Sequence, residues 1–132
     1  MKKERYQRNN NYFCHYFGLN LELEETYIEL AMVQEKLVAS DVPMLTEIYE
    51  ERTEKLLKRM DELQKKQEHI RDIIDLNPEE LTRKILYKTY IDHEPYNVVA
   101  EELNISRSTL FRKIKEADRL AREQESGEHE GI

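Results

Sequence analysis

The sequence predicts an all-α protein in which an N-terminal helical hairpin precedes a smaller C-terminal helical domain. The 132 residues include only three Gly and three Pro, so few positions interrupt a helix. Apolar residues recur at spacings of three, four and seven over long stretches, which is the period of amphipathic helices. Charged residues make up 37% of the chain and hydrophobic residues 39%. That balance is typical of exposed helices with narrow apolar stripes.

Residues 1–18 form a predicted N-terminal arm with four basic side chains and one acidic side chain. Its aromatic residues are Tyr6, Tyr12, Phe13, Tyr16 and Phe17. Basic residues interleaved with aromatic rings can stack on nucleic-acid bases. The alternative, which we favour, is that the rings cap the hydrophobic seam of the helices that follow. The basic start is not followed by an apolar run, so no secretory signal is expected.

Residues 19–75 are predicted to form a coiled-coil-like helical hairpin. In the first helix, 19–39, the residues expected on one face are Leu23, Tyr27, Leu30, Gln34 and Leu37. Pro43 cannot continue this helix, and it biases the residue before it toward an extended backbone. The second helix, 44–75, has a seam with a spacing of seven at Tyr49, Leu56, Leu63 and Ile70, supported by Ile48, Met60, Ile73 and Ile74.

The sequence does not decide which surface this seam packs against. It can be buried between the two helices of the hairpin or against a second copy of the chain. A homodimer through residues 19–75 is the assembly that we expect.

Residues 76–122 are predicted to form the C-terminal domain. Asn77 suits the N-cap of its first helix, Pro78 the first helical position and Glu80 the capping box. The apolar residues of this helix are Leu81, Ile85, Leu86, Tyr87, Tyr90 and Ile91. A turn is expected at residues 92–95, because Pro95 has no amide donor. The last segment, 123–132, is acidic and is predicted to be disordered.

Residues 96–117 have the pattern of a helix-turn-helix. Ala100 is small where a second helix would cross the first, and Val99 and Leu103 are expected to face inward. Asn104 occupies the turn, where a left-handed backbone is often required and Asn tolerates it. Ile105 is expected to enter the core, and Ser106 can cap the second helix. Leu110, Ile114 and Ala117 then give that helix an apolar face.

The second helix of this pattern is the basic part of an acidic protein. The net charge is −7, yet residues 106–122 carry six basic and two acidic side chains. In a helix-turn-helix the first turns of the second helix enter the major groove. We therefore assign Arg107, Ser108 and Arg112 to base contacts, because Arg can bind guanine bidentately. The residues assigned to the DNA backbone are Thr109, Lys113, Lys115 and Arg119.

The stretch from Val99 to Ile114 resembles region four of bacterial sigma factors, the module that reads the −35 promoter element. The longer stretch from Leu81 to Leu120 resembles phage and prophage transcriptional activators of the RinA and ArpU type. In sigma region four the residues that match Arg107, Ser108 and Arg112 approach the bases. Ser108 and Arg112 replace the acidic residue and Gln that are usual there, so a different target sequence is implied. Nothing in the chain resembles the promoter-melting region two.

The sequence therefore predicts a cytoplasmic, sequence-specific transcription regulator that binds double-stranded DNA with the helix 107–117. RNA polymerase is a second candidate partner, through the N-terminal helices. Two alternatives are the small subunit of a phage terminase and a coiled-coil adaptor that does not bind DNA. The chain has one cysteine and four scattered histidines. It has no phosphate-binding Gly-rich loop and no nucleophile elbow. We therefore expect no enzyme activity, no cofactor, no metal site and no membrane span.

Overall fold

The computed structural model describes residues 11–130, and no β-strand occurs among them. The predicted all-α class is confirmed. The chain divides into two compact units, which are described separately. One unit is Gly18–Glu68, and the described part of the other comprises residues 11–17 and 69–130. No helix within residues 11–130 is long and apolar enough to cross a membrane.

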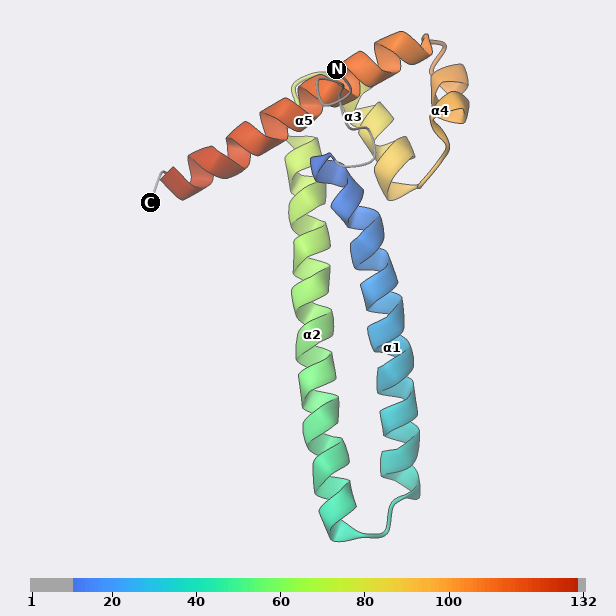
Figure 1. Cartoon of the computed structure of the whole chain (residues 1–132), viewed down its shortest axis with the longest axis vertical. Coiled ribbons are helices and arrows are strands. Elements are labelled where there is room, and N and C mark those ends of the chain that lie inside the picture. The colour runs from blue at the N-terminus through green and yellow to red at the C-terminus, as the bar shows by residue number, and fades with distance from the viewer. Residues whose placement is uncertain (1–10, 131–132) are drawn as a thin grey trace, which may run out of the picture. The chain divides into compact units, whose positions relative to one another are not determined.

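The unit Gly18–Glu68 is an antiparallel hairpin of helices α1 (His15–Ala39) and α2 (Pro43–Asp75), as Figure 1 shows. Pro43 is the first residue of α2, where its missing amide hydrogen costs nothing. Thr46 closes the connection, since both its backbone N–H and its hydroxyl bond to the Val42 carbonyl, at 3.0 and 3.2 Å. The predicted helical hairpin is confirmed.

The inward face of α1 differs from the predicted one. Tyr27 is 64% exposed and Gln34 is also exposed, so these two assignments were wrong. Their neighbours Thr26 and Val33 lie inward instead. The seam alternates steps of four and three along Leu19, Leu23, Thr26, Leu30, Val33 and Leu37. Thr26 tolerates burial because its hydroxyl donates a 2.7 Å hydrogen bond to the carbonyl of Glu22.

The seam of α2 follows the predicted spacing of seven. Leu56, Leu63 and Ile70 are buried and Tyr49 is half-buried. The buried Gln67 lies on the same face and bonds through its amide to Asn20 of α1. Ile48 does not support the seam, because it is 52% exposed. One residue of helix is a rotation of about 100°, which moves Ile48 away from Tyr49.

The second unit is a small helical domain built around α5 (Arg107–Glu130). Its other helices are the 3-10 helix η3 (Tyr12–Cys14), α3 (Glu80–Leu86), the π-helix η4 (Tyr87–Ile91) and α4 (Tyr96–Glu102). Helices α3, α4 and η3 all contact α5. The hydrophobic core side chains with no more than 4% exposure are Phe13, Tyr16, Ile74, Ile85, Leu86, Val99, Ala100, Leu110, Ile114, Ala117 and Ala121.

The start of α3 was predicted too early. The helix begins at Glu80, and Glu79 rather than Asn77 occupies the N-cap position. Asn77 instead accepts a 3.0 Å hydrogen bond from the Glu79 amide, two residues ahead. Such a local turn competes with the helix for the same backbone groups. The capping box predicted from Asn77 and Glu80 is therefore not formed.

Helix α5 is longer than the predicted helix 107–117. It continues to Glu130, through most of the segment 123–132 that was expected to be disordered. The helix contains no Pro, and Ala, Arg, Gln and Glu in its second half favour helix. An ion pair between Arg119 and Glu123, four residues apart, spans the expected boundary.

Candidate nucleic-acid interface

The connection between α4 and α5 is a tight turn with a left-handed residue at its centre. Asn104 has φ 56°, as the sequence predicts. The amide of Ile105 donates to the Ala100 carbonyl at 3.0 Å, and the amide of Asn104 donates to Glu101 at 3.1 Å. This pair of bonds is a Schellman motif, which satisfies the last carbonyls of a helix. The turn therefore fixes the direction in which α5 begins.

Ser106 caps the start of α5, also as predicted. Its hydroxyl oxygen accepts a 3.0 Å hydrogen bond from the amide of Thr109. The Ser106 hydroxyl in turn donates to the Thr109 hydroxyl at 2.9 Å. Thr109 is half-buried, and its hydrogen bonds to Ser106 fix the orientation of its side chain.

The two helices are held together by a small apolar core. Val99 and Ala100 of α4 are buried, as are Leu110 and Ile114 of α5. Fixing one face of α5 in this way leaves the opposite face to solvent. Outside the core, Tyr96 packs edge-to-face on Phe111 with ring centroids 5.0 Å apart.

The exposed face of α5 brings together four of the seven residues assigned to DNA. Arg107, Ser108, Arg112 and Lys115 are all exposed. The Arg107 guanidinium lies over the Phe111 ring, 5.6 Å from its centroid. None of the described residues forms a hydrogen bond or an ion pair with Arg112 or Lys115. These two cations are therefore open to an external anion.

Lys113 and Arg119 instead have intramolecular partners. The Lys113 ammonium lies 2.8 and 2.9 Å from the two carboxylate oxygens of Glu79, and its side chain is only 19% exposed. This hydrogen bond, with a second from Thr82, holds the pKa of Glu79 below its usual value. Arg119 bridges Glu116 and Glu123 on its own helix. Surface pairs of this kind contribute little stability and can exchange partners.

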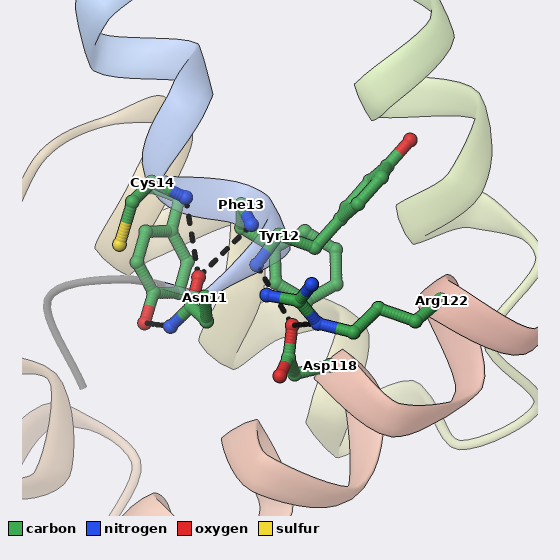
Figure 2. Close-up of polar contacts among 7 residues, drawn as sticks. Asn11, Tyr12, Phe13, Cys14, Asp118 and Arg122 are labelled. Atoms are coloured by element: carbon green, nitrogen blue, oxygen red, sulfur yellow. Dashed lines mark hydrogen bonds and ion pairs between the residues drawn. The ribbon is translucent and has the colours of Figure 1, made fainter. Parts of the chain in front are cut away.

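The sequence did not predict the buried polar anchor that holds the segment before α1 in the helical domain. This anchor begins at Asn11. Asn11 and Phe13 are each only 1% exposed. Figure 2 shows the Asn11 side chain accepting from the amides of Phe13 and Cys14, at 2.9 and 3.1 Å. Its amide nitrogen donates to the Tyr90 hydroxyl at 2.7 Å. Asn11 therefore caps η3 and joins it to η4.

Asp118 connects the same segment to α5. Its carboxylate accepts from the Tyr12 amide at 2.7 Å and from Arg122 at 3.0 Å, as Figure 2 shows. The Tyr12 hydroxyl bonds to Glu125, which also lies 2.7 Å from His69. Tyr12 and Phe13 of the arm thus pack within the helical domain, and the predicted capping of the hairpin seam stays a prediction. The arm residues 1–10 lie outside the described residues.

Among the side chains that the structure describes, those of residues 11–126, no group of three or more His, Cys, Asp and Glu is arranged to hold a metal ion. The site is therefore defined by the exposed basic face of α5, its capped turn and its buried anchor. We refer to Arg107, Ser108, Arg112 and Lys115 as the basic face.

Together, the fold and the site define an all-helical protein that presents a basic helix after a tight turn. The model of a family described as "Protein of unknown function (DUF1492)" matches residues 38–121, and the chain belongs to that family. The matched region covers α2 to α4 and the part of α5 that carries the basic face. No curated protein and no solved structure matches the chain.

Proposed function

We propose that this chain is a sequence-specific DNA-binding regulator of transcription, of the phage and prophage activator type. Its α4–turn–α5 segment acts as a helix-turn-helix, and the first turns of α5 enter the major groove of promoter DNA. Arg107, Ser108 and Arg112 read bases, while Thr109, Lys113, Lys115 and Arg119 contact the phosphate backbone.

The observation that carries this proposal is the charge and exposure of the start of α5. Arg112 and Lys115 are exposed and have no intramolecular ion pair with the side chains of residues 11–126. The opposite face of the same turns is buried through Leu110 and Ile114. A basic face on a rigidly held helix is what phosphate binding and base readout require.

The proposed contacts are not equivalent along the helix. Arg119 lies twelve residues beyond Arg107, which is about 18 Å along an α-helix. Base contacts are expected from the first two turns, so Arg119 is placed at the edge of the interface. Lys113 reaches DNA only by leaving Glu79, which makes Lys115 the stronger candidate for a phosphate contact.

The hairpin is proposed to form a homodimer. Leu21, Ile28 and Met32 of α1 are 46%, 60% and 55% exposed. They recur at steps of seven and four on the side of α1 opposite its seam. We call these three residues the outer stripe. An apolar stripe on the outside of a two-helix hairpin is suited to packing against a second hairpin. RNA polymerase is the alternative partner for this surface.

The test is selection of duplex DNA from a randomised library by the full chain, repeated with Arg112→Ala. An enriched motif that loses its preference at one position in the variant supports the proposal. Loss of a bidentate base contact is expected to weaken binding by about 1–3 kcal/mol. Lys58→Ala, at an exposed position of the hairpin, is the matched control. No enrichment, or an unchanged motif with Arg112→Ala, would contradict it.

The same selection, together with a mass measurement, distinguishes the two alternative functions from the proposed one. An adaptor would enrich no motif and show no salt-dependent DNA binding. A terminase small subunit would form a ring of about eight or more subunits, which mass measurement of the assembly detects.

A further inference from the structure

A cavity of about 530 Å³ lies beside the junction of η4 and α4. This volume is in the range of sites that bind small molecules. Its lining comes from η4, from residues 93–96 and from Cys14 and Phe17. None of these residues belongs to the basic face, so the cavity is separate from the proposed DNA interface.

Two buried polar atoms in the lining have no hydrogen-bond partner among the side chains of residues 11–126 or the described backbone. They are the hydroxyl oxygen of Thr89, a residue only 5% exposed, and one carboxylate oxygen of Glu94. Buried polar atoms are almost always hydrogen-bonded in proteins. Because a carboxylate oxygen accepts and a hydroxyl can accept, the pair is suited to a donor group from outside the chain.

A neighbouring carboxyl group also favours a cation at this place. Glu94 and Glu102 share a hydrogen bond that raises the pKa of Glu94. On its other side Glu102 lies 3.2 Å from the Lys88 ammonium. An ammonium group at Glu94 would stabilise the ionised form of this carboxyl pair.

The rest of the cavity wall is largely aromatic. The rings of Phe17 and His93 are stacked, with centroids 4.1 Å apart and planes 8° from parallel. Tyr90 and Tyr96 also line the cavity, with hydroxyl oxygens 3.5 Å apart. Aromatic faces attract cations and bury apolar carbon. Acceptors beside aromatic rings are the combination that recognises an organic ammonium.

The backbone around the cavity departs from regular helix. Residues Tyr87–Ile91 form a π-helix, and His93 has φ 57°. Both conformations are uncommon and tend to occur at functional sites. Here they bring Thr89, Tyr90, His93 and Glu94 to one cavity within six residues of sequence.

We propose that this cavity binds a small organic amine. The ammonium group donates to Thr89 Oγ1 and to the Glu94 carboxylate, and its apolar part lies among the aromatic rings. The proposal does not rest on DNA binding, and its test requires no DNA.

The experiment measures binding of benzylamine, a cation at neutral pH, to the full chain by titration calorimetry. Benzyl alcohol, similar in size but uncharged, is expected to bind at least about tenfold more weakly. Glu94→Gln and Thr89→Val are each expected to weaken benzylamine binding, the former by about tenfold or more. Glu101→Gln, an exposed carboxyl on α4, is the matched control and should leave the affinity unchanged.

Cys14 supplies an independent report of the location, since it lines the cavity and is the chain's only cysteine. Saturating benzylamine should slow alkylation of this thiol by iodoacetamide several-fold in the unaltered chain. The proposal is overturned if benzylamine does not bind, if benzyl alcohol binds equally well, or if Cys14 is not protected. Equal affinity in Glu94→Gln and Thr89→Val, both shown to be folded by circular dichroism, would also overturn it.

Discussion

At the scale of single residues, the helical domain depends on polar side chains whose partners are far away in the sequence. Asn11 is 1% exposed and satisfies two amides of η3 and the hydroxyl of Tyr90. Removing a buried side chain that makes several hydrogen bonds leaves each partner unsatisfied. The position therefore matters for stability although it lies at the edge of the described chain.

Asn11→Ala should lower the free energy of unfolding by about 2–3 kcal/mol, because a cap and a buried hydrogen bond are lost together. Urea denaturation followed by circular dichroism measures this change. Asn97→Ala, at an exposed position of α4, is the control and should change stability by no more than about 0.5 kcal/mol. An equally small effect at Asn11 would show that η3 does not stabilise the domain.

The Glu79–Lys113 pair makes a pH-dependent contribution. Lys113 holds the pKa of Glu79 below its usual value. A carboxyl with a lowered folded-state pKa contributes stability above its unfolded-state pKa and loses it as the pH falls through the folded value. Glu79→Gln should therefore be less stable than the unaltered chain near pH 7, and the two should converge in acid, once the pH is below the folded-state pKa of Glu79. Thermal unfolding at both pH values checks this, and a difference that persists in acid would contradict it.

At the scale of elements, the turn between α4 and α5 shows which features local sequence determines. The left-handed Asn104 and the Ser106 cap were predicted because each depends on neighbours a few residues away. The start of α3 was placed wrongly because Asn77 supports an alternative local turn. Sequence periodicity does not decide whether an Asn side chain caps a helix or closes a local turn.

The seam of α1 illustrates a second limit. Tyr27 and Gln34 fit a helical period, but Thr26 and Val33 fit the same period with a rotation of about 100°. Which stripe is buried depends on the partner helix α2, whose contacts are distant in sequence, as the Glu29–Arg52 pair shows with a separation of 23 residues. The Asn11 anchor was missed for the same reason, since Asn11 and Tyr90 are 79 residues apart.

The backbone at Asn104 supports a prediction about this turn. Asn104→Gly should retain the stability of the unaltered chain or raise it slightly, because Gly adopts positive φ without steric cost. Asn104→Ala should lower the free energy of unfolding by about 1–2 kcal/mol. Urea denaturation of both variants measures the difference in their free energy of unfolding. Equal stability of Gly and Ala would show that the left-handed turn is not maintained in solution.

At the scale of the whole molecule, the charge of the chain is divided between its parts. The hairpin residues Gly18–Glu68 carry more acidic than basic side chains, whereas residues 106–122 carry six basic and two acidic ones. A net charge of −7 would by itself disfavour DNA. DNA binding depends on the local electrostatic potential at the basic face. Acidic residues elsewhere in the chain make the affinity for DNA more dependent on orientation and on salt concentration.

The outer stripe of the hairpin supports a prediction about assembly. Ile28→Glu places a charge within the exposed apolar stripe of Leu21, Ile28 and Met32, so the proposed dimer should dissociate. Sedimentation analysis should then give the mass of a single chain, about 16 kDa. Gln34→Glu, an exposed substitution on a different side of α1 from the stripe, also adds one negative charge to the helix and should leave the dimer intact.

The same variant links assembly to DNA recognition. A symmetric dimer selects two half-sites separated by about 10–10.5 base pairs or a multiple of that spacing. The Ile28→Glu monomer should select one half-site and bind it more weakly, since the effective concentration of the second basic face is lost. Library selection with both proteins makes the comparison. A paired site that persists in a proven monomer would assign dimerisation to another surface, whereas a single half-site in both proteins would show that the hairpin serves a different partner.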